Sequence, residues 1–347
     1  MTGESTDSVN RVQPAALTVA VIGVGSMGRN HARVYSELPE ARLVGVADSD
    51  PATASRVGQT FGVPGYQDYR QMLEKICPQA VSISVPTALH EEVTLFAMES
   101  GAHVLVEKPI AAALDEGERL IQRAMDLSRH LMVGHIVRFN PAIQALKHKL
   151  ENEELGRIYQ IICRRAGPFP ARIRDVGVVI DLAPHDLDLM RFLTGLNPLR
   201  VFAETQQRIH TDHEDLLLGL LRFPDDVSGL LEINWLTPTK LREVLVLGER
   251  GLLRVDDLTQ DLYFYENAQA SSLSWSSLQN IKGVSEGSMT RFALQRYEPL
   301  KAELLAFLRA IQENNPVPVS GEDGLAALRL ALALVESGRT HSIVSVL

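Results

Sequence analysis

The stretch 17-LTVAVIGVGSMG-28 decides the fold, because a run of apolar residues passes directly into a glycine-rich turn. The turn matches the pattern G-x-G-x-x-G. Its first glycine permits a tight turn, its second lets backbone N–H groups approach a pyrophosphate, and its third lets a helix pack on the strand. The next apolar run ends in Asp48, a carboxylate that can accept hydrogen bonds from ribose hydroxyls. The candidate cofactor-binding residues of this region are Gly23, Gly25, Ser26, Met27, Gly28 and Asp48.

The charge of Asp48 bears on which dinucleotide binds. Its carboxylate would repel a 2′-phosphate, so the sequence favours NAD over NADP. Two other interpretations remain open: Asp48 also suits an ordinary turn in 48-DSDP-51, and Arg56 could reach a 2′-phosphate. Asp50 is expected to be the N-cap of a helix that begins at Pro51.

Short apolar runs alternate with amphipathic stretches from Leu17 to Val137. The runs are rich in Val and Ile and continuous in hydrophobicity, which is typical of strands buried on both faces; they span 17–24, 43–48, 80–85, 103–108 and 131–137. This alternation predicts an α/β Rossmann domain with a doubly wound parallel sheet over residues 16–138. The polar segment 1–15 is expected to be a mobile tail.

The pattern becomes α+β over residues 139–347. Turn residues separate successive strand-like runs, as expected for antiparallel neighbours. Strands are predicted at about 156–165, 199–207, 215–223, 229–236 and 243–248, and helices at about 141–152, 182–193, 297–311 and 323–337. Several strands are apolar on both sides, so helices would cover one face, and a second subunit or a sandwich within the chain would cover the other. The segment Ser271–Ser288 is expected to be a long loop.

Composition narrows the function classes. The chain has 347 residues, 45% of them hydrophobic, and a formal net charge of −9, which disfavours nonspecific binding to nucleic acid. The two cysteines form no metal-binding or disulfide pattern and suit a reducing compartment. Neither a signal peptide nor a run of about 18 apolar residues occurs, so a cytoplasmic protein without membrane spans is expected. His210, Asp212, His213 and Glu214 lack a further well-spaced ligand, so no metal is predicted.

Two short motifs carry candidate chemistry. Glu107-Lys108-Pro109 follows a predicted parallel strand, at the sheet edge where ligands bind, and Lys108 could stabilise a developing negative charge on a substrate oxygen. In 181-DLAPHDLD-188, Asp181 and His185 share a helix face, and histidine is a suitable general base for a hydroxyl. The plainer interpretations are a solvated lysine, and an N-cap at Asp181 with Pro184 in the first helical turn.

Taken together, these motifs resemble the Gfo/Idh/MocA oxidoreductase family, and the resemblance runs from residue 17 to the end of the chain. It includes 84-SVP-86, His90 and 134-GHIVRFNP-141. The resemblance implies a Rossmann domain followed by an α+β domain, whose large, mostly antiparallel open sheet mediates dimers or tetramers. It also implies a cis bond before Pro109, the catalytic residues Lys108, Asp181 and His185, and further cofactor contacts from Pro86, His90, Glu107 and Lys108. Pro184 departs from the family, which often has glycine or serine there.

Arginines just before the catalytic pair point to an anionic substrate, because the guanidinium fork suits phosphate and carboxylate. The segment 163–188 resembles the subgroup that oxidises the C3 hydroxyl of UDP-N-acetylglucosamine or a close relative. The alternative is a solvated strand face with structural ion pairs. The candidate substrate contacts are Arg138, Asn140, Arg164, Arg165, Arg172, Arg174, Asp181 and His185.

The sequence therefore predicts an NAD-dependent sugar dehydrogenase that acts on a small molecule, with His185 as general base, Lys108 on the forming carbonyl and Asp181 orienting the histidine. An inositol or simple-sugar dehydrogenase of the same family is an alternative, which would leave the arginines without a ligand. A non-catalytic regulator that senses NAD or sugar is an alternative of another class, although the catalytic residues of the family are all present.

Overall fold

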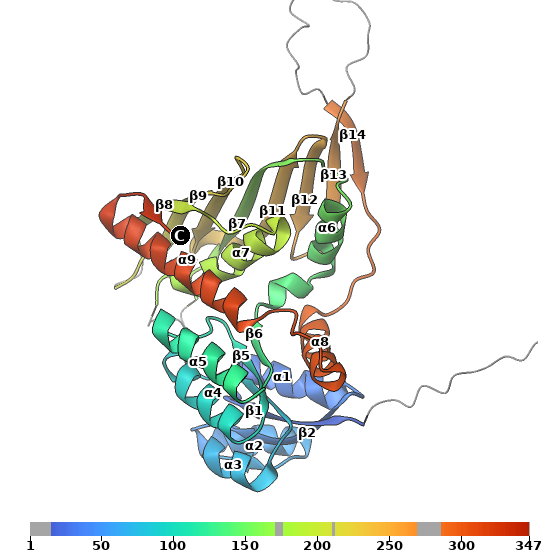
Figure 1. The fold of residues 1–347 in the computed structure, drawn as a ribbon, viewed down its shortest axis with the longest axis vertical. Coiled ribbons are helices and arrows are strands. Elements are labelled where there is room, and N and C mark those ends of the chain that lie inside the picture. Colours follow the sequence, from blue (N-terminus) through green and yellow to red (C-terminus); the bar gives the residue numbers. More distant parts are fainter. Residues whose placement is uncertain (1–14, 171–175, 210–211, 269–285, 347) are drawn as a thin grey trace, which may run out of the picture.

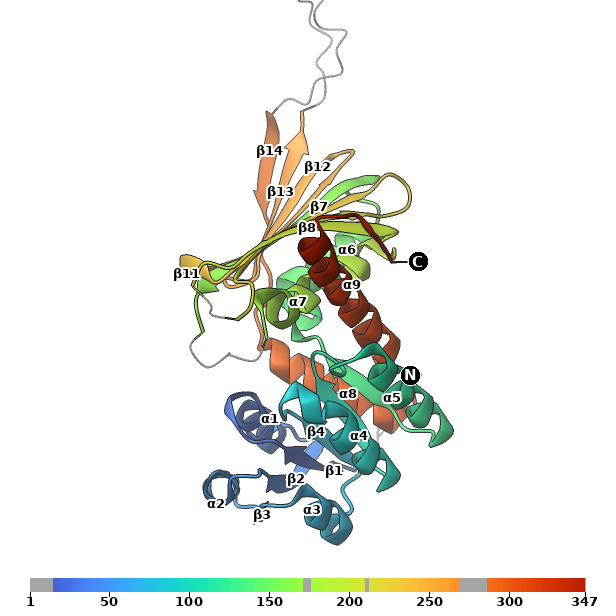
Figure 2. The same cartoon turned by 90° about the vertical axis from the view of Figure 1, so that its left-hand side faces the viewer.

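The computed structural model describes residues 15–170, 176–209, 212–268 and 286–346. Two β-sheets, each with its own helices, lie one above the other along the long axis of the molecule (Figures 1 and 2). Nearly all of the predicted tail and most of the predicted loop Ser271–Ser288 fall outside the described residues, as do Arg172, Arg174 and His210.

The first sheet is parallel, with strand order β3-β2-β1-β4-β5-β6. Its strands are β1 Leu17–Ile22, β2 Ala41–Ala47, β3 Gly65–Tyr66, β4 Ala80–Ile83, β5 His103–Glu107 and β6 Leu131–Gly134. The helices that join them are α1 Ser26–Glu37, α2 Pro51–Phe61, α3 Tyr69–Ile76, α4 His90–Glu99 and α5 Leu114–Asp126, with a short 3-10 helix, η1 Thr87–Leu89. This order is that of a doubly wound nucleotide-binding sheet, which confirms the predicted fold class. Asp50 caps α2, as predicted, by accepting from the N–H groups of Ala52 and Thr53.

The last strand of this sheet is shorter than predicted. β6 ends at Gly134, opposite Glu107, where β5 itself ends and offers no further partner. The chain then forms a 3-10 helix, η2 Ile136–Phe139, before the second half begins.

The second sheet is large and mostly antiparallel, again as predicted, with strand order β14-β13-β12-β11-β7-β10-β9-β8-β15 and β7–β10 as the parallel pair among the described strands. Its strands are β7 Ile158–Pro168, β8 Arg200–Gln206, β9 Leu216–Arg222, β10 Ser228–Asn234, β11 Leu236–Gly248, β12 Gly251–Asp256, β13 Asp261–Asn267, β14 Glu286–Arg291 and β15 Val344–Ser345. Three helices, α6 Pro141–Glu151, α7 Val178–Thr194 and α9 Gly321–Thr340, cover one face of it (Figure 2).

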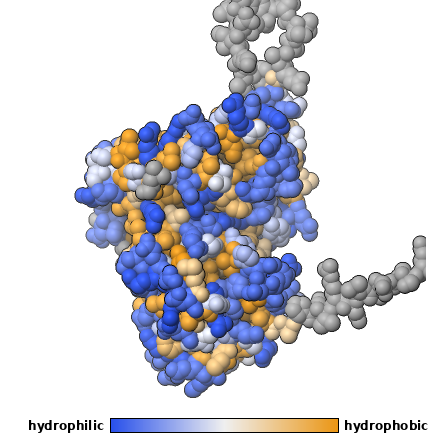
Figure 3. Space-filling model, in the orientation of Figure 1, coloured by the Kyte–Doolittle hydropathy of each residue, from blue (hydrophilic) through white to orange (hydrophobic). Residues whose placement is uncertain are grey.

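None of the helices that the structure describes lies on the other face of the second sheet, which is open in Figure 2. Leu218 and Leu220 of β9 and Leu247 of β11 are exposed, and they alternate with buried neighbours. Strand residues point alternately to the two faces, so these leucines form an apolar surface on the open side. On the face seen in Figure 3, apolar patches are interspersed with hydrophilic side chains over both halves.

One late helix belongs to the core of the first half. Leu304, Phe307 and Leu308 of α8 Pro299–Glu313 are fully buried in the same apolar cluster as the strands of the parallel sheet, and α8 lies beside that sheet in Figures 1 and 2. The chain therefore returns to the first sheet after β14 and then goes back to the second sheet with α9 and β15. Among the described residues, no helix combines the length and the apolar content that crossing a membrane requires.

The predicted start of the helix that carries Asp181 is wrong. α7 begins at Val178, after the N-cap Gly177, and Pro184 lies inside the helix rather than in its first turn. The cap comes from a distant residue: the Glu214 carbonyl accepts from the Val178 N–H, and the Glu214 carboxylate accepts from the Val179 N–H at 3.1 Å. A partner so far along the chain satisfies the free N–H groups of the helix start, and local sequence signals do not reveal it.

Candidate active site

The glycine turn between β1 and α1 is shaped for a pyrophosphate. Gly23 has φ +80°, and a side chain there would meet the backbone of Ser84. A Cβ on Gly28 would clash with the Gly23 carbonyl oxygen, so the helix can pack this closely only with glycine. Gly25 differs, because a Cβ there would meet nothing within 4 Å. The space above Gly25 is open, as binding of a phosphate group against the backbone requires.

The first turn of α1 has free N–H groups. Its N-cap, Gly25, makes no side-chain cap, and the first turn, which includes Ser26 and Met27, contains no acidic residue. Such a helix start attracts an anion through its N–H groups and its dipole. The predicted residues Gly23, Gly25, Ser26, Met27 and Gly28 thus form one cradle, and it fits the pyrophosphate of a dinucleotide.

Asp48 lies beside this cradle at the end of β2. Its carboxylate accepts from the Val24 N–H at 2.9 Å and from the Asp50 N–H at 3.0 Å. These bonds fix the carboxylate next to the glycine turn, where ribose hydroxyls would reach it. Arg56, the residue that could have favoured a 2′-phosphate, instead donates to Thr53 on the exposed side of α2.

The other predicted cofactor contacts surround the ends of β4 and β5. Pro86 is exposed in the turn after β4. His90 is buried, with its ring nitrogens 2.7 Å from the Pro109 carbonyl and 3.0 Å from the Val85 carbonyl. Burial lowers the pKa of His90, against the raising effect of these carbonyls. His90 therefore joins the turn after β4 to the turn after β5 from a buried position.

Glu107 ends β5 and pairs with a histidine that the sequence analysis missed. His31 of α1, which is fully buried, lies with Nε2 3.1 Å from the Glu107 carboxylate. Burial raises the pKa of Glu107, but the hydrogen bond and charge of His31, together with Lys108 and His90, lower it below its ordinary value. The signal was present in sequence: His31 follows Gly28 by three residues, on the helix face that packs on the sheet.

Lys108 and Asp181 meet between the two halves of the molecule. The peptide bond Lys108–Pro109 is cis, as the family resemblance implied. The Lys108 Nζ donates to the Asp181 carbonyl at 2.6 Å and to its carboxylate at 3.1 Å. Pro184, three residues on, has no N–H to donate to the Ile180 carbonyl, which precedes the carbonyl that Lys108 binds.

His185 lies next to this pair in an environment that keeps its ring neutral. Burial, and then the positive charge of Lys108, lower its pKa well below the ordinary value. A neutral imidazole is the form that accepts a proton. Its Nδ1 is buried without a hydrogen-bond partner, so the expected bond from Asp181 to the imidazole is absent from this structure, and Asp181 holds Lys108 instead.

His135 is a second missed residue near the centre. It is buried, neither ring nitrogen has a hydrogen-bond partner, and its Nδ1 lies 3.9 Å from the carboxylate of Asp188. Burial lowers its pKa, and the charge of Lys108 acts in the same direction. The motif 134-GHIVRFNP-141 contains His135, but only Arg138 and Asn140 of this motif were predicted to be site residues.

The predicted arginine cluster is divided by the sheet. Arg164 lies on the open face, where its guanidinium pairs with Glu232 at 2.8 Å and with Glu243 at 3.3 Å. Arg165 points to the helix side and forms a buried, two-pronged ion pair with Asp186, at 2.7 and 2.8 Å. Consecutive strand residues cannot share a face, so Arg164 is turned away from Lys108 and His185.

Arg138 and Asn140, the other predicted substrate contacts, are engaged by the protein itself. Arg138 is buried between the carboxylates of Asp188 and Asp323, at 2.7 and 3.1 Å. Asn140 caps α6 and donates to the backbone and carboxylate of Asp257. The partners of Arg138 and Asn140 are distant in the sequence. The sequence alone does not reveal these partners, so both side chains were predicted to be free to bind a ligand.

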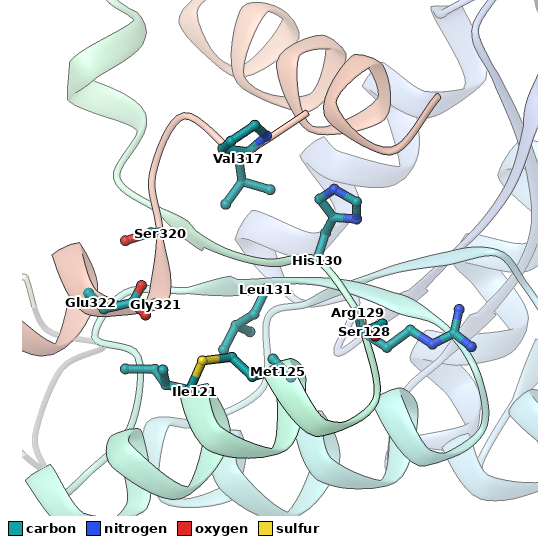
Figure 4. A pocket seen from close by; sticks show the side chains of 12 residues that line it. Ile121, Met125, Ser128, Arg129, His130, Leu131, Val317, Ser320, Gly321 and Glu322 are labelled. Atoms are coloured by element: carbon teal, nitrogen blue, oxygen red, sulfur yellow. The ribbon is translucent and has the colours of Figure 1, made fainter. Parts of the chain in front are cut away.

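A separate cleft lies between the end of α5 and residues 316–322 (Figure 4). Met125, His130 and Val317 are among its lining side chains, and none of the predicted site residues lines it. Among the described residues, no group of three or more histidine, cysteine or carboxylate side chains is arranged to hold a metal ion. Glu214, one of the residues considered for a metal, caps α7.

Comparison with known proteins places the chain in a family. Residues 17–135 match the model "Oxidoreductase family, NAD-binding Rossmann fold", and residues 143–254 match the "GFO/IDH/MocA C-terminal domain". UDP-N-acetylglucosamine 3-dehydrogenase from Acidithiobacillus ferrooxidans is 30% identical over 91% of this chain and 95% of its own length. A structure of that enzyme matches with a TM-score of 0.83 at 29% identity, covering 94% of this chain and 98% of the other.

A second relative has a different substrate in its name. The scyllo-inositol 2-dehydrogenase (NAD(+)) from Bacillus subtilis is 31% identical over 92% of this chain and 93% of its own. With the cradle, Asp48 and the Lys108–Asp181 pair in place, the conclusion is direct: the chain is an NAD-binding oxidoreductase of the Gfo/Idh/MocA family.

Proposed function

We propose that this oxidoreductase oxidises a secondary hydroxyl of a sugar, the C3 hydroxyl of UDP-N-acetylglucosamine or of a related nucleotide sugar. The observation that carries the proposal is the meeting of Lys108, Asp181 and a neutral His185 between the two sheets. Full-length similarity to UDP-N-acetylglucosamine 3-dehydrogenase supports the choice of substrate.

In the proposed mechanism, His185 accepts the proton of the sugar hydroxyl. Its ring is neutral at pH 7, because burial and Lys108 lower its pKa. Lys108 donates a hydrogen bond to the same oxygen as a carbonyl forms, which stabilises developing negative charge. Asp181 positions the Lys108 ammonium through its carboxylate and its backbone carbonyl.

NAD supplies the two-electron acceptor when it is bound. Gly23, Gly25 and Gly28 would hold the pyrophosphate through backbone N–H groups, and Asp48 would hold the ribose hydroxyls. The carboxylate of Asp48 disfavours a 2′-phosphate, so we infer a preference for NAD over NADP. Pro86, Glu107 and Lys108 would border the nicotinamide end, while His90 would act from behind the turn.

The substrate contacts that the structure supports are fewer than the sequence suggested. Arg164 faces the other side of the sheet, and Arg138 and Asn140 are held by internal partners. Arg165 lies on the correct side but donates to Asp186. The proposed substrate side of the site therefore begins with Asp181 and His185 and extends along the helix-covered face of the second sheet.

Oxidation of an inositol is the second candidate, and the Bacillus subtilis relative favours it. The two candidates differ in charge, since a cyclitol is neutral and a nucleotide sugar carries a diphosphate. Initial rates of NAD reduction with UDP-N-acetylglucosamine and with scyllo- and myo-inositol separate them.

We further propose a homodimer or homotetramer in which a second copy covers the open sheet face. The exposed leucines of β9 and β11 support this, because a monomer gains nothing from leaving such a surface in water. Both cysteines are free thiols, which suits work in the reducing cytoplasm.

The test of the function is NAD reduction by the wild-type chain and by two variants, Lys108→Ala and His185→Ala. We expect each substitution to lower kcat by at least about a hundredfold, with the thermal midpoint retained. Near-wild-type turnover in either folded variant would remove that residue from the mechanism. No NAD reduction with any nucleotide sugar would refute the substrate class.

A further inference from the structure

An arginine that the sequence analysis did not consider, Arg242, stands beside Arg165 on the helix-covered face of the second sheet. The two residues are directly paired across the antiparallel strands β11 and β7. Glu243 and Arg164, the next pair, form an ion pair on the open face. Because side chains alternate along a strand, Arg242 and Arg165 point together to the side on which His185 lies.

The two guanidinium groups differ in how their charge is balanced. Arg165 is matched by the two-pronged bond to Asp186. Arg242 donates from one terminal nitrogen to the carbonyl oxygens of Ala166 and Leu241, at 2.7 and 2.8 Å, and no carboxylate of the described residues pairs with it. Like charges directly across a strand pair are destabilising, so a charged Arg242 beside Arg165 costs folding free energy.

The nearby carboxylates do not remove this excess. Asp186 is already engaged by Arg165, and the Asp257 carboxylate accepts from the Asn140 amide. Burial and the charge of Arg165 lower the pKa of the Arg242 guanidinium, and Arg242 in turn lowers the pKa of His185. Positive charge thus accumulates next to the proposed base.

The guanidinium of Arg242 also has donors left to offer. Its Nε and second terminal nitrogen make no hydrogen bond with the described residues, and the side chain is only partly buried. A planar guanidinium with free donors binds phosphate oxygens in a two-pronged manner. An anion bound there would satisfy these donors and relieve the repulsion from Arg165.

We propose that Arg242 recognises the phosphate of the substrate and so selects nucleotide sugars over neutral cyclitols. This inference rests on the proposed function, since it assigns the anionic end of the same substrate. It replaces Arg164 and Arg165 in that role with a residue 77 positions after Arg165, on a neighbouring strand.

The experiment compares Arg242→Gln with a matched control, Arg164→Gln, which removes the same side chain from the opposite face of the sheet. Binding of UDP is measured by calorimetry with saturating NADH, so that UDP cannot occupy the dinucleotide cradle. KM and kcat for UDP-N-acetylglucosamine and for scyllo-inositol are measured in parallel. Arg242→Lys keeps the charge without the fork and serves if the glutamine variant does not fold.

We expect Arg242→Gln to weaken UDP binding, and to raise KM for the nucleotide sugar, by at least about tenfold. Arg242→Lys should fall between it and the wild type. Arg164→Gln should bind UDP as the wild type does, and any turnover of scyllo-inositol should keep its KM in all three variants.

The outcomes distinguish this inference from the proposed function. Oxidation of UDP-N-acetylglucosamine with unchanged KM in Arg242→Gln would overturn the role of Arg242 and leave the function standing. UDP binding that depends on Arg242, without oxidation of the nucleotide sugar, would support Arg242 and reject the substrate. A wild-type chain that binds neither UDP nor inorganic pyrophosphate would overturn both.

Discussion

The adjacent arginines of β7 offer a test of how the second sheet balances charge. Arg165 is buried and makes two hydrogen bonds to the equally buried Asp186. Its side chain is 8% exposed, whereas that of Arg164 is 40% exposed on the open face. Replacing each by methionine, which has a similar length and no charge, should therefore have very different effects on stability.

The expected magnitudes follow from burial. Arg165→Met leaves the Asp186 carboxylate buried without its partner, which costs about 3–5 kcal/mol of unfolding free energy. Arg164→Met breaks exposed ion pairs, which contribute only about 0–1 kcal/mol. With about 2–4 °C of thermal midpoint per kcal/mol for a domain of this size, Arg165→Met should lower the midpoint by roughly 6–20 °C, and Arg164→Met by less than about 4 °C.

Thermal unfolding followed by circular dichroism at pH 7.5, at equal protein concentration, measures both shifts. The double variant Arg165→Met, Asp186→Leu should recover most of the loss, because it removes the unpaired charge. Equal shifts for the two single variants would refute the assignment of Arg165 to the buried face. So would a double variant that is no more stable than Arg165→Met.

Five further expectations concern the cofactor, the base and the open face. Gly25→Val should weaken NADH binding by at least about tenfold in a fluorescence titration, with the apo thermal midpoint retained because a Cβ at this position meets nothing within 4 Å. Asp48→Asn should reduce the ratio of kcat/KM for NAD over NADP by about tenfold or more; an unchanged ratio would mean that another group reads the ribose. Because the pKa of His185 is lowered, its neutral form persists below pH 6.5, so kcat/KM should stay level through that pH and decline only in more acid buffer. Arg242→Gln should move this decline to higher pH, since one lowering charge is lost. Leu218→Arg should shift the mass measured by light scattering toward the monomer, and an unchanged mass would exclude the open face as the interface.

The regular parts of the fold could be predicted from sequence because their signals are local. The continuous apolar strands, the glycine turn and the Asp50 cap each lie within a few residues of the element they define. Period and turn chemistry are sufficient for such elements. The same logic predicted a mostly antiparallel second sheet.

Features that depend on distant residues were missed. α7 starts at Val178 because Glu214 caps it from another part of the chain, so Asp181 and Pro184 suggested a false start. Ile136 and Val137, the first two residues of η2, were predicted as strand, because the residues of β6 do not reveal where its partner β5 ends.

The candidate site was predicted in kind but not in detail. Lys108, Asp181 and His185 are brought together, yet the pairing of Lys108 with Asp181 had to be seen in three dimensions. Arg164 and Arg165 are neighbours in sequence, but they lie on opposite faces of the sheet because strand residues alternate. Arg242 is far from Arg165 in sequence and becomes adjacent to it only through the pairing of β11 with β7.

The return of α8 to the first sheet bears on how the halves can be exchanged between proteins. A fragment that ends after β6 would lack α8 with Leu304, Phe307 and Leu308. The apolar residues of the parallel sheet that these side chains cover would then be exposed to water. The nucleotide-binding unit is thus discontinuous along the chain: β7–β14 of the second sheet lie between β6 and α8, and α9 and β15 follow α8. A chimera that joins the cofactor half to a new substrate half therefore needs three junctions, one near η2, one before α8 and one between α8 and α9, and a graft with a single junction should aggregate.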